Sequence, residues 1–276
     1  VMGTTQYRTD TSLYTHKCTF YSCVCSIRIT NENCLRVTKM ATVNGLSGLI
    51  LKAPDLENTS KFYTECWGLE AVEYSGSDTL FFKGNDEEPF IFGLTPGDER
   101  AIDTVRLAMK SVADIDFIYQ ELQSTGIKLI GQPGTLAQPG NYYGFRFKDP
   151  DGTQVELSTL DADDSVKNSI SGFLPQRLSH LVLNSPDNIT LRDFYIRYLG
   201  FELADWYAKD IFFFLRCNRQ HHCLGIERSD NTSLNHVAFL VPNLDAMMRF
   251  VGRMSNLGFE PLWGPGRHGP GGNCFC

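Results

Sequence analysis

Apolar and polar positions follow one another along this chain in a repeated order: a strand, an amphipathic helix and three further strands. The first such unit opens with the apolar run Val43–Ala53, and the turn signal Pro54-Asp55 separates this run from a helix expected over Leu56–Trp67. Gly68 ends the helix, because glycine tolerates a positive φ at a helix C-terminus. Short strands are then expected over Glu70–Tyr74, Thr79–Lys83 and Phe90–Leu94.

A second unit begins with a strand at Thr104–Met109. Its helix is expected over Val112–Ser124, with an inward face of Ile115, Ile118, Tyr119 and Leu122. The turn KDPDGT carries the Asp-Gly signal of a β-hairpin. The strands of this unit are expected at Ile127–Ile130, Tyr142–Lys148 and Thr153–Ser158.

The remaining chain follows the same order. A strand at Leu178–Asn184 precedes a helix at Asn188–Leu199, and a later strand at His236–Val241 precedes a helix at Leu244–Leu257. The strands between them are expected at Phe201–Trp206, Ile211–Leu215 and His222–Ile226. The inward face of the last helix is expected to comprise Leu244, Met247, Met248, Val251 and Met254.

The two halves are copies of each other. Shifting the sequence by 132 residues, the difference between Pro54 and Pro186, superimposes LKAPDLENTSKFYTECWGLE on LNSPDNITLRDFYIRYLGFE without a gap. Such a repeat predicts an α+β fold of tandem βαβββ modules. We expect a leader at 1–39, an N-terminal domain at 43–160, a polar linker at 161–175 and a C-terminal domain at 176–276 whose last module is cut short.

Composition narrows the class of protein. The 276 residues carry a formal net charge of −7 with a sequence pI near 5.4, and no basic stripe indicates binding to nucleic acid. No apolar run reaches the roughly 18 residues of a membrane span, and the leader lacks the secretory pattern, so it is expected to be disordered or non-native sequence upstream of Met40. Four of the nine cysteines lie in the leader, with a spacing that matches neither a common zinc pair nor a disulfide framework. The other five are expected to be reduced thiols of a cytoplasmic protein.

Histidines distinguish the second copy from the first. Gly48 lies opposite His180 and Thr104 opposite His236 in the shifted sequence, and the other histidines of the second copy also face residues that are not histidine. One such histidine is ordinarily a hydrogen-bonded core residue. Several at the same landmarks of one copy indicate a metal site instead, because neutral imidazoles are ligands for iron, zinc, copper and nickel.

His180 and His236 each lie in the opening strand of a module, so pseudo-symmetry is expected to direct both at one centre. A carboxylate would complete the two-histidine, one-carboxylate face of non-haem Fe(II) oxygenases. Its natural source is the last strand of the fourth module, where the counterpart of Glu156 would be residue 288, outside this chain. Glu227 and Glu260 do not align with that position.

The motifs SHLVLNSPD, LRCNRQHHCLGI, NHVAFLV and GPGRHG, with FKDPDGTQVEL in the first half, resemble those of the type I extradiol (ring-cleaving) catechol dioxygenases of the vicinal oxygen chelate superfamily. The resemblance covers residues 44–276. It implies two domains with concave mixed sheets. It also implies a bound Fe(II), with Mn(II) as the alternative, and cleavage of a catechol-type substrate with O₂. The oligomeric state is left open, with a homo-oligomer among the possibilities.

The resemblance also implies roles for individual residues. His180 and His236 would bind the metal, His222 would be the acid–base residue, and His268 would contact the substrate. His221 is expected on the opposite side of the His222 strand, since side chains alternate. The predicted pocket walls, for each of which simple packing is the alternative, are Phe214, Trp263 and Asn184.

Two other functions are weighed against ring cleavage. One is another enzyme of the superfamily, such as a glyoxalase-like lyase or isomerase, which has no need of the paired histidines or of GPGRHG. The other is a non-catalytic protein that binds a planar aromatic molecule, which the missing carboxylate ligand favours. With only two histidine ligands, metal affinity and activity are expected to be impaired in this chain.

Overall fold

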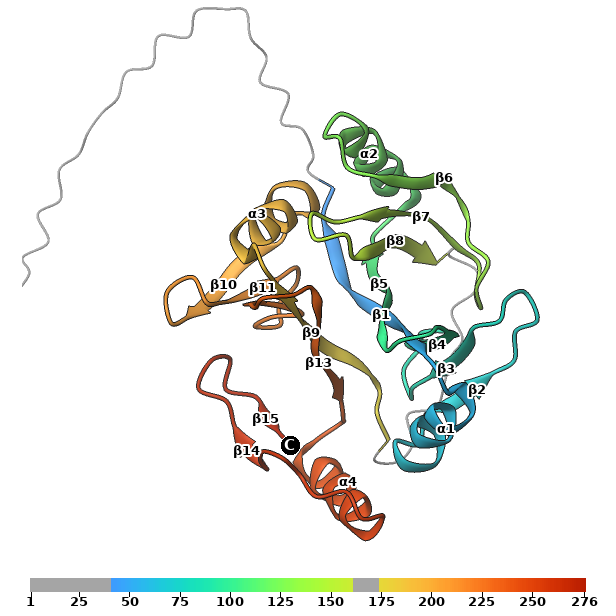
Figure 1. Ribbon diagram of the computed structural model, residues 1–276, viewed down its shortest axis with the longest axis vertical. Helices are drawn as coiled ribbons and strands as arrows, with labels where there is room; N and C mark the ends of the chain where they lie inside the picture. The colour runs from blue at the N-terminus through green and yellow to red at the C-terminus, as the bar shows by residue number, and fades with distance from the viewer. Residues whose placement is uncertain (1–40, 161–173) are drawn as a thin grey trace, which may run out of the picture. The chain divides into compact units, whose positions relative to one another are not determined.

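The computed structural model describes residues 41–160 and 174–276, which fold into two mixed β-sheets with helices packed on them (Figure 1). The predicted leader, 1–39, and most of the predicted linker lie outside the described residues. The architecture is the expected α+β fold of tandem βαβββ modules.

The first half forms an eight-stranded sheet in the order β2-β3-β4-β1-β5-β8-β7-β6. Strand β1 runs parallel to β4 and antiparallel to β5, while β5 runs parallel to β8. Each module therefore contributes four neighbouring strands, and the two opening strands pair in the middle of the sheet. The bounds are β1 Val43–Ala53, β2 Glu70–Val72, β3 Leu80–Lys83, β4 Phe92–Pro96, β5 Ala101–Met109, β6 Leu129–Thr135, β7 Tyr142–Lys148 and β8 Gln154–Leu160.

The second half forms a five-stranded sheet in the order β10-β11-β12-β9-β13. Its bounds are β9 Arg177–Ser185, β10 Glu202–Tyr207, β11 Phe212–Arg216, β12 Leu224–Arg228 and β13 Ser233–Leu240. A separate two-stranded ribbon, β14 Gly266–Arg267 and β15 Cys274–Phe275, follows near the end of the chain. This sheet thus has the third module complete, with the opening strand of the fourth beside it.

The structure repeats with the same offset as the sequence. Gly48 pairs with Arg106 across β1 and β5, and His180 pairs with Ala238 across β9 and β13, both shifted by 132. The helix caps agree as well, because the Asp55 side chain accepts from Asn58 N and the Asp187 side chain accepts from Thr190 N. The repeat therefore sets strand register and helix capping in both halves.

The helices differ in detail from their predicted bounds. Helix α1, Leu56–Lys61, continues as a wider π-helical turn over Phe62–Cys66, where Trp67 N donates to Phe62 O. Helices α2, Val112–Gln123, and α3, Asn188–Leu199, agree closely with expectation, and Gly200, which follows α3, adopts a φ of 71°. The predicted inward face of α2 is largely buried.

Helix α4, Leu244–Asn256, corrects the prediction for its inward face. Met247 is buried, but Leu244 and Met248 are 57% and 45% exposed. Figure 1 shows α2, the counterpart of α4, lying along β6, β7 and β8. The five-stranded sheet ends at β13, so the described residues offer α4 no such strands to cover its apolar face.

Aromatic rings connect the two halves. Trp67 packs against Phe239 and Phe250, with ring centroids 4.7 and 4.9 Å apart, and Phe147 lies 5.9 Å from Phe194. The hydroxyl of Tyr195 donates to Asp149 Oδ2 over 3.2 Å. Residues 39–276 form a single unit through contacts of this kind.

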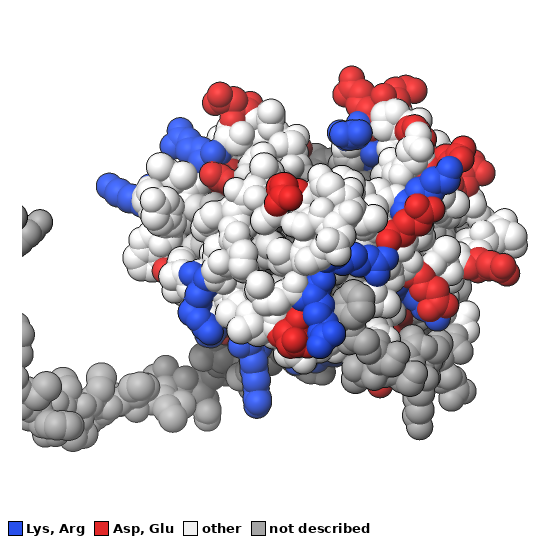
Figure 2. All heavy atoms as spheres, turned by 90° about the horizontal axis from the view of Figure 1, so that it is seen from below, with Lys and Arg blue, Asp and Glu red and all other residues white. Residues whose placement is uncertain are grey.

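Charged side chains are scattered over the face drawn in Figure 2, where basic and acidic residues lie close together around an uncharged area. This face carries no continuous basic surface, in keeping with the acidic composition. Among the helices that the structure describes, none combines the length and apolar character needed to cross a lipid bilayer.

Candidate functional site

His180 and His236 are brought together by the pairing of β9 with β13. Antiparallel register sets His180 opposite Ala238 and His236 opposite Val182, so the two histidines are diagonal neighbours on one face of the sheet. Their Nε2 atoms lie 3.3 Å apart, and their rings are nearly perpendicular, at 85°. The expected convergence of these two imidazoles is present in the structure.

Hydrogen bonding determines which nitrogen of His236 is free. The side-chain amide of Asn235 donates through Nδ2 to Glu227 Oε2 and to Asn184 Oδ1, so its Oδ1 acts as the acceptor for His236 Nδ1, 2.9 Å away. A neutral imidazole carries one N–H, and here it is on Nδ1. The lone pair of His236 Nε2 therefore faces His180.

The surroundings keep these imidazoles neutral. Burial, together with repulsion from His222, His236 and His268, lowers the pKa of His180 to about 3. Burial also lowers the pKa of His236, with a smaller effect from His268. Neutral imidazole is the form that binds a metal ion.

His222 forms the third corner of this histidine cluster. Its ring centroid lies 4.4 Å from that of His180 and 5.0 Å from that of Phe214. Burial, together with repulsion from His221, His268 and His236, lowers the pKa of His222 to about 4. His222 is therefore an uncharged imidazole near neutral pH, beside the histidine pair.

The expected placement of His221 and His222 on opposite sides of a strand is wrong. Strand β12 begins at Leu224, so His221 and His222 lie in the preceding loop, where strand alternation does not apply. Their Nδ1 atoms lie 3.0 Å apart, close enough for one to donate to the other. His221 Nε2 in turn lies 3.8 Å from Asp205 Oδ2 on β10. The two histidines are thus joined in a chain of polar groups rather than separated by the strand.

His268 lies in the turn of the β14–β15 ribbon, and its charge lowers the pKa values of His180, His222 and His236. Its ring packs on Phe275 and Trp263, with centroids 4.2 and 5.1 Å away. In the same ribbon, a Cβ on Gly271 would come within 2.8 Å of His221 Cγ, and Gly271 has a φ of +71°. Glycine is therefore required where the ribbon crosses the histidines.

The predicted pocket walls are placed differently from one another. Phe214 lies against both His221 and His222, whereas Trp263 is 66% exposed and its ring packs on His268 and Phe275 of the ribbon. Asn184 donates to Ser233 Oγ and accepts from Asn235, so it belongs to the network that orients His236. Asn235 and Asp205 were not predicted from the sequence. The one sequence feature that could have indicated a role for Asn235 is its position directly before His236 on a strand.

In the first half of the chain, an arginine occupies the place that corresponds to the histidine pair of the second half. Arg106 Nε donates to Glu156 Oε1 over 3.0 Å, and both side chains are fully buried. Arg146 and Gln138 also bind this carboxylate. A Cβ on Gly48, the counterpart of His180, would lie 2.9 Å from Arg106 Nη1. Glu156, the counterpart of the expected third ligand, is thus held by arginine cations in this half.

The residues present can supply two metal ligands. Two nitrogens 3.3 Å apart fit a shared ion at about 2.1 Å from each, the distance typical of histidine and zinc. Within residues 41–160 and 174–276, no group of three or more His, Cys, Asp or Glu side chains is arranged to hold a metal ion. Glu227 accepts from Asn235 and Glu260 accepts from Ser255, which agrees with their exclusion as ligands.

Comparisons with known proteins agree with this repeated architecture. The family model of the Glyoxalase/Bleomycin resistance protein/Dioxygenase superfamily matches residues 45–157 and 177–275, once in each half. The Mn(II)-bound glyoxalase of Novosphingobium aromaticivorans is similar in structure, with a TM-score of 0.78, 34% identity, and 84% of this chain and 77% of that chain covered.

Two curated relatives are ring-cleaving enzymes by name. Metapyrocatechase 2 of Cupriavidus necator is 28% identical over 183 residues, which span 59% of this chain and 56% of that protein. The manganese-dependent 2,3-dihydroxybiphenyl 1,2-dioxygenase of Geobacillus genomosp. 3 is 23% identical over 244 residues, which span 80% of this chain and 76% of that protein. The chain belongs to the Glyoxalase/Bleomycin resistance protein/Dioxygenase superfamily.

Proposed function

We propose that the second half of this chain is the catalytic half of an extradiol dioxygenase that opens the ring of a catechol-type diol with O₂. The observation that carries this proposal is the pair of Nε2 atoms of His180 and His236, 3.3 Å apart and both uncharged. Relatives named metapyrocatechase and 2,3-dihydroxybiphenyl dioxygenase support it.

His180 and His236 would hold the metal, which we take to be Fe(II), with Mn(II) as the alternative. The bound ion would supply a Lewis-acid site that orients the diol and O₂ together. Asn235 would act on the metal site through His236, because its amide oxygen keeps the proton on Nδ1 and leaves Nε2 free to coordinate. Asn235 is therefore a positioning residue in this proposal.

His222 would move the substrate proton. The carboxylate of Asp205 favours a proton on His221 Nε2, so that His221 Nδ1 accepts from His222 Nδ1. This tautomer leaves the Nε2 lone pair of His222 free to take a proton from a catechol hydroxyl and to return it during ring opening. Phe214 and the ribbon carrying His268 would border the diol.

The described residues provide no carboxylate ligand at this centre. We therefore expect the 276-residue chain to bind metal weakly and to turn over slowly, because affinity depends on the number of ligands. The five described cysteines are unpaired thiols, and we infer a cytoplasmic location from them.

A glyoxalase-like activity is the second candidate, because the Mn(II)-bound structural relative bears that name. Separate assays with a catechol and with a hemithioacetal of glutathione distinguish the dioxygenase from the glyoxalase-like enzyme. Formation of a coloured ring-fission product with consumption of O₂ supports the dioxygenase, while loss of hemithioacetal without consumption of O₂ supports the isomerase. Binding of a catechol with neither reaction would indicate a non-catalytic aromatic-binding protein.

The metal site is tested with Mn(II), whose free ion is counted by electron paramagnetic resonance. We expect His180→Ala and His236→Ala to abolish binding and Asn235→Ala to weaken it roughly 10- to 100-fold. His222→Asn should retain Mn(II) binding and lose ring cleavage after anaerobic loading with Fe(II). His16→Ala, a histidine of the predicted leader, is the matched control. Unchanged Mn(II) binding in both His180→Ala and His236→Ala would rule out this centre.

A further inference from the structure

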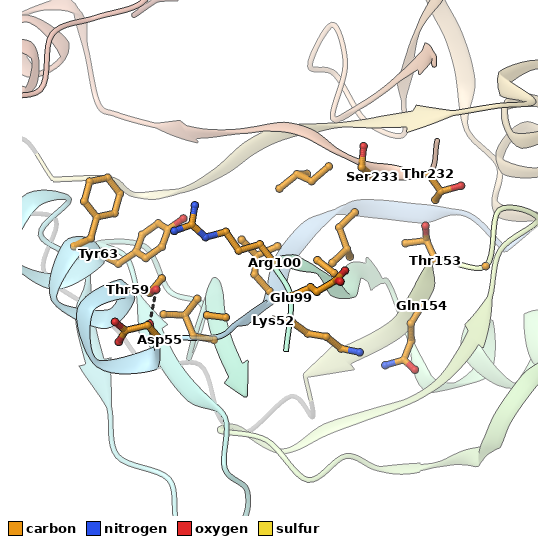
Figure 3. Close-up of a pocket in the computed structure, with 18 of the residues that line it drawn as sticks. Lys52, Asp55, Thr59, Tyr63, Glu99, Arg100, Thr153, Gln154, Thr232 and Ser233 are labelled. Carbon is orange, nitrogen blue, oxygen red and sulfur yellow. Dashed lines mark hydrogen bonds between the residues drawn. The ribbon is translucent and has the colours of Figure 1, made fainter. Parts of the chain in front are cut away.

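A cavity of about 990 Å³ is lined mainly by the first half of the chain, and none of the clustered histidines borders it. It is bordered by helix α1, by the facing ends of β1 and β5, by the turn between β7 and β8, and by the start of β13 (Figure 3). Tyr63, Phe62 and Arg100 contribute to its wall. Neither the proposed metal ligands nor the predicted substrate contacts take part in it.

The counterpart of this place in the second half is filled by a turn. Shifted by 132, Tyr63 corresponds to Tyr195, whose hydroxyl donates to Asp149 Oδ2 over 3.2 Å. Phe62 corresponds to Phe194, whose ring lies 5.9 Å from that of Phe147. The turn Asp149–Gly152 and the strand before it thus dock on α3 through one hydrogen bond and one ring contact.

The two helices share features of their ends, although Tyr63 lies in a π-helical turn and Tyr195 in a regular α-helix. Leu69 N donates to Tyr63 O over 3.0 Å, and Phe201 N donates to Tyr195 O over 3.2 Å, again with an offset of 132. Both helices end in a glycine with positive φ, Gly68 at 74° and Gly200 at 71°. Tyr63 and Tyr195 therefore precede the same kind of helix ending, at equivalent positions of the repeat.

The chemistry inside the cavity suits a carboxylate. Burial raises the pKa of Tyr63 to about 12, so its hydroxyl remains a hydrogen-bond donor, and within the described part of the chain no residue accepts from it. Figure 3 shows the side chain of Arg100 extending toward Tyr63, and its charge acts on the Tyr63 pKa. A carboxylate at the position equivalent to Asp149 would meet both groups.

We propose that this cavity is the docking site for a polypeptide β-turn of the Asp-Xaa-Asp-Gly type, in which the first carboxylate accepts from Tyr63 and an aromatic residue two positions earlier packs on Phe62. The occupant would resemble the turn Asp149–Gly152 together with the strands that flank this turn. The counterparts of Asp149–Thr153, one repeat later, would be positions 281–285, outside this sequence. Phe259, whose ring now lies 5.4 Å from that of Phe62, would move aside.

The probe is a fluorescent peptide with the sequence FKDPDGTQV, identical to residues 147–155, titrated with the full chain and followed by anisotropy. We expect saturable binding that falls roughly tenfold in Tyr63→Phe, the loss of one hydrogen bond to a charged group. Thr59→Arg, which places a long side chain in the cavity, should abolish binding. A peptide with Ala in place of its first Asp should bind as weakly to wild type as the parent peptide does to Tyr63→Phe.

Tyr198→Phe is the matched control, because Tyr198 is a helical tyrosine that does not border the cavity. It should bind the peptide as wild type does, and so should His236→Ala, which separates this site from the metal centre. Circular dichroism confirms that each variant is folded. Absence of saturable binding to wild type, or equal affinity of wild type and folded Tyr63→Phe, would overturn the proposal.

Discussion

Asp149 provides the sharpest test of how the two halves are held together. Its side chain is 3% exposed, and its Oδ1 accepts from the backbone N–H groups of Asp151 and Thr153. Its Oδ2 accepts from the hydroxyl of Tyr195 in the other half. We expect replacement of Asp149 by Asn to stabilise the protein at neutral and alkaline pH.

The magnitude follows from the pKa of the carboxyl. Burial, with a contribution from the charge of Asp151, raises the pKa of Asp149 from 3.8 to about 7, despite opposing hydrogen bonds such as that from Thr153. Below pH 3.8 the carboxyl is protonated in both the folded and the unfolded state. Between pH 3.8 and 7 only the unfolded state loses the proton, so the free energy of unfolding falls as the pH rises. At about 1.4 kcal/mol for each unit, the total loss is about 4 kcal/mol by pH 8.

Asparagine has no proton to lose. Its carbonyl oxygen can still accept from Asp151 N and Thr153 N, and its amide group can donate to the Tyr195 oxygen, which replaces the original bond. The variant should therefore match wild type near pH 4 and exceed it progressively up to pH 8.

Urea unfolding at pH 4, 5, 6, 7 and 8 measures this difference for wild type and Asp149→Asn. Asp193→Asn, a change at a carboxyl that is 61% exposed, is the control and should follow wild type at every pH. A stability difference between wild type and Asp149→Asn that does not change from pH 4 to pH 8 would refute the assignment of a raised pKa to Asp149.

Two further predictions concern close contacts. Gly48→Ala should lower the free energy of unfolding by about 1–3 kcal/mol, because its Cβ would lie 2.9 Å from Arg106 Nη1 in a filled interior. Gly134→Ala should be neutral or stabilising, because a Cβ at Gly134 would have nothing within 4 Å. Equal urea midpoints for the two variants would contradict this prediction. The Sγ atoms of Cys217 and Cys223 lie 3.2 Å apart, so diamide should oxidise the two thiols to an intramolecular disulfide. A peptide mass map would show this disulfide as the loss of two hydrogens. Linkage of either residue to another cysteine instead would count against the contact.

Prediction from sequence succeeded where the information is local or repeated. The period of apolar residues and the Asp and Gly signals at helix ends located α3 and β7 to the residue, because caps and turns depend on neighbours within four positions. The offset of 132 brought His180 and His236 to equivalent strands, and equivalent strands in a duplicated fold pair in the same register.

Prediction failed where distant segments decide the outcome. The loop that brings the Nδ1 atoms of His221 and His222 into contact depends on packing against Phe214 and Gly271, which no local pattern shows. The exposed face of α4 likewise depends on which strands lie beside β13.

The sequence by itself determined the duplication, the order of strands and helices, and the presence of histidines in one copy alone. Only the tertiary structure decided that Asn235 orients His236, that Arg106 neutralises buried Glu156 in the first half, and that Tyr63 faces a cavity while Tyr195 is bonded. The physical reason is that a side chain's hydrogen-bond partner and burial are set by residues brought near in space, and these lie 46 positions away for Tyr195 and 50 for Arg106.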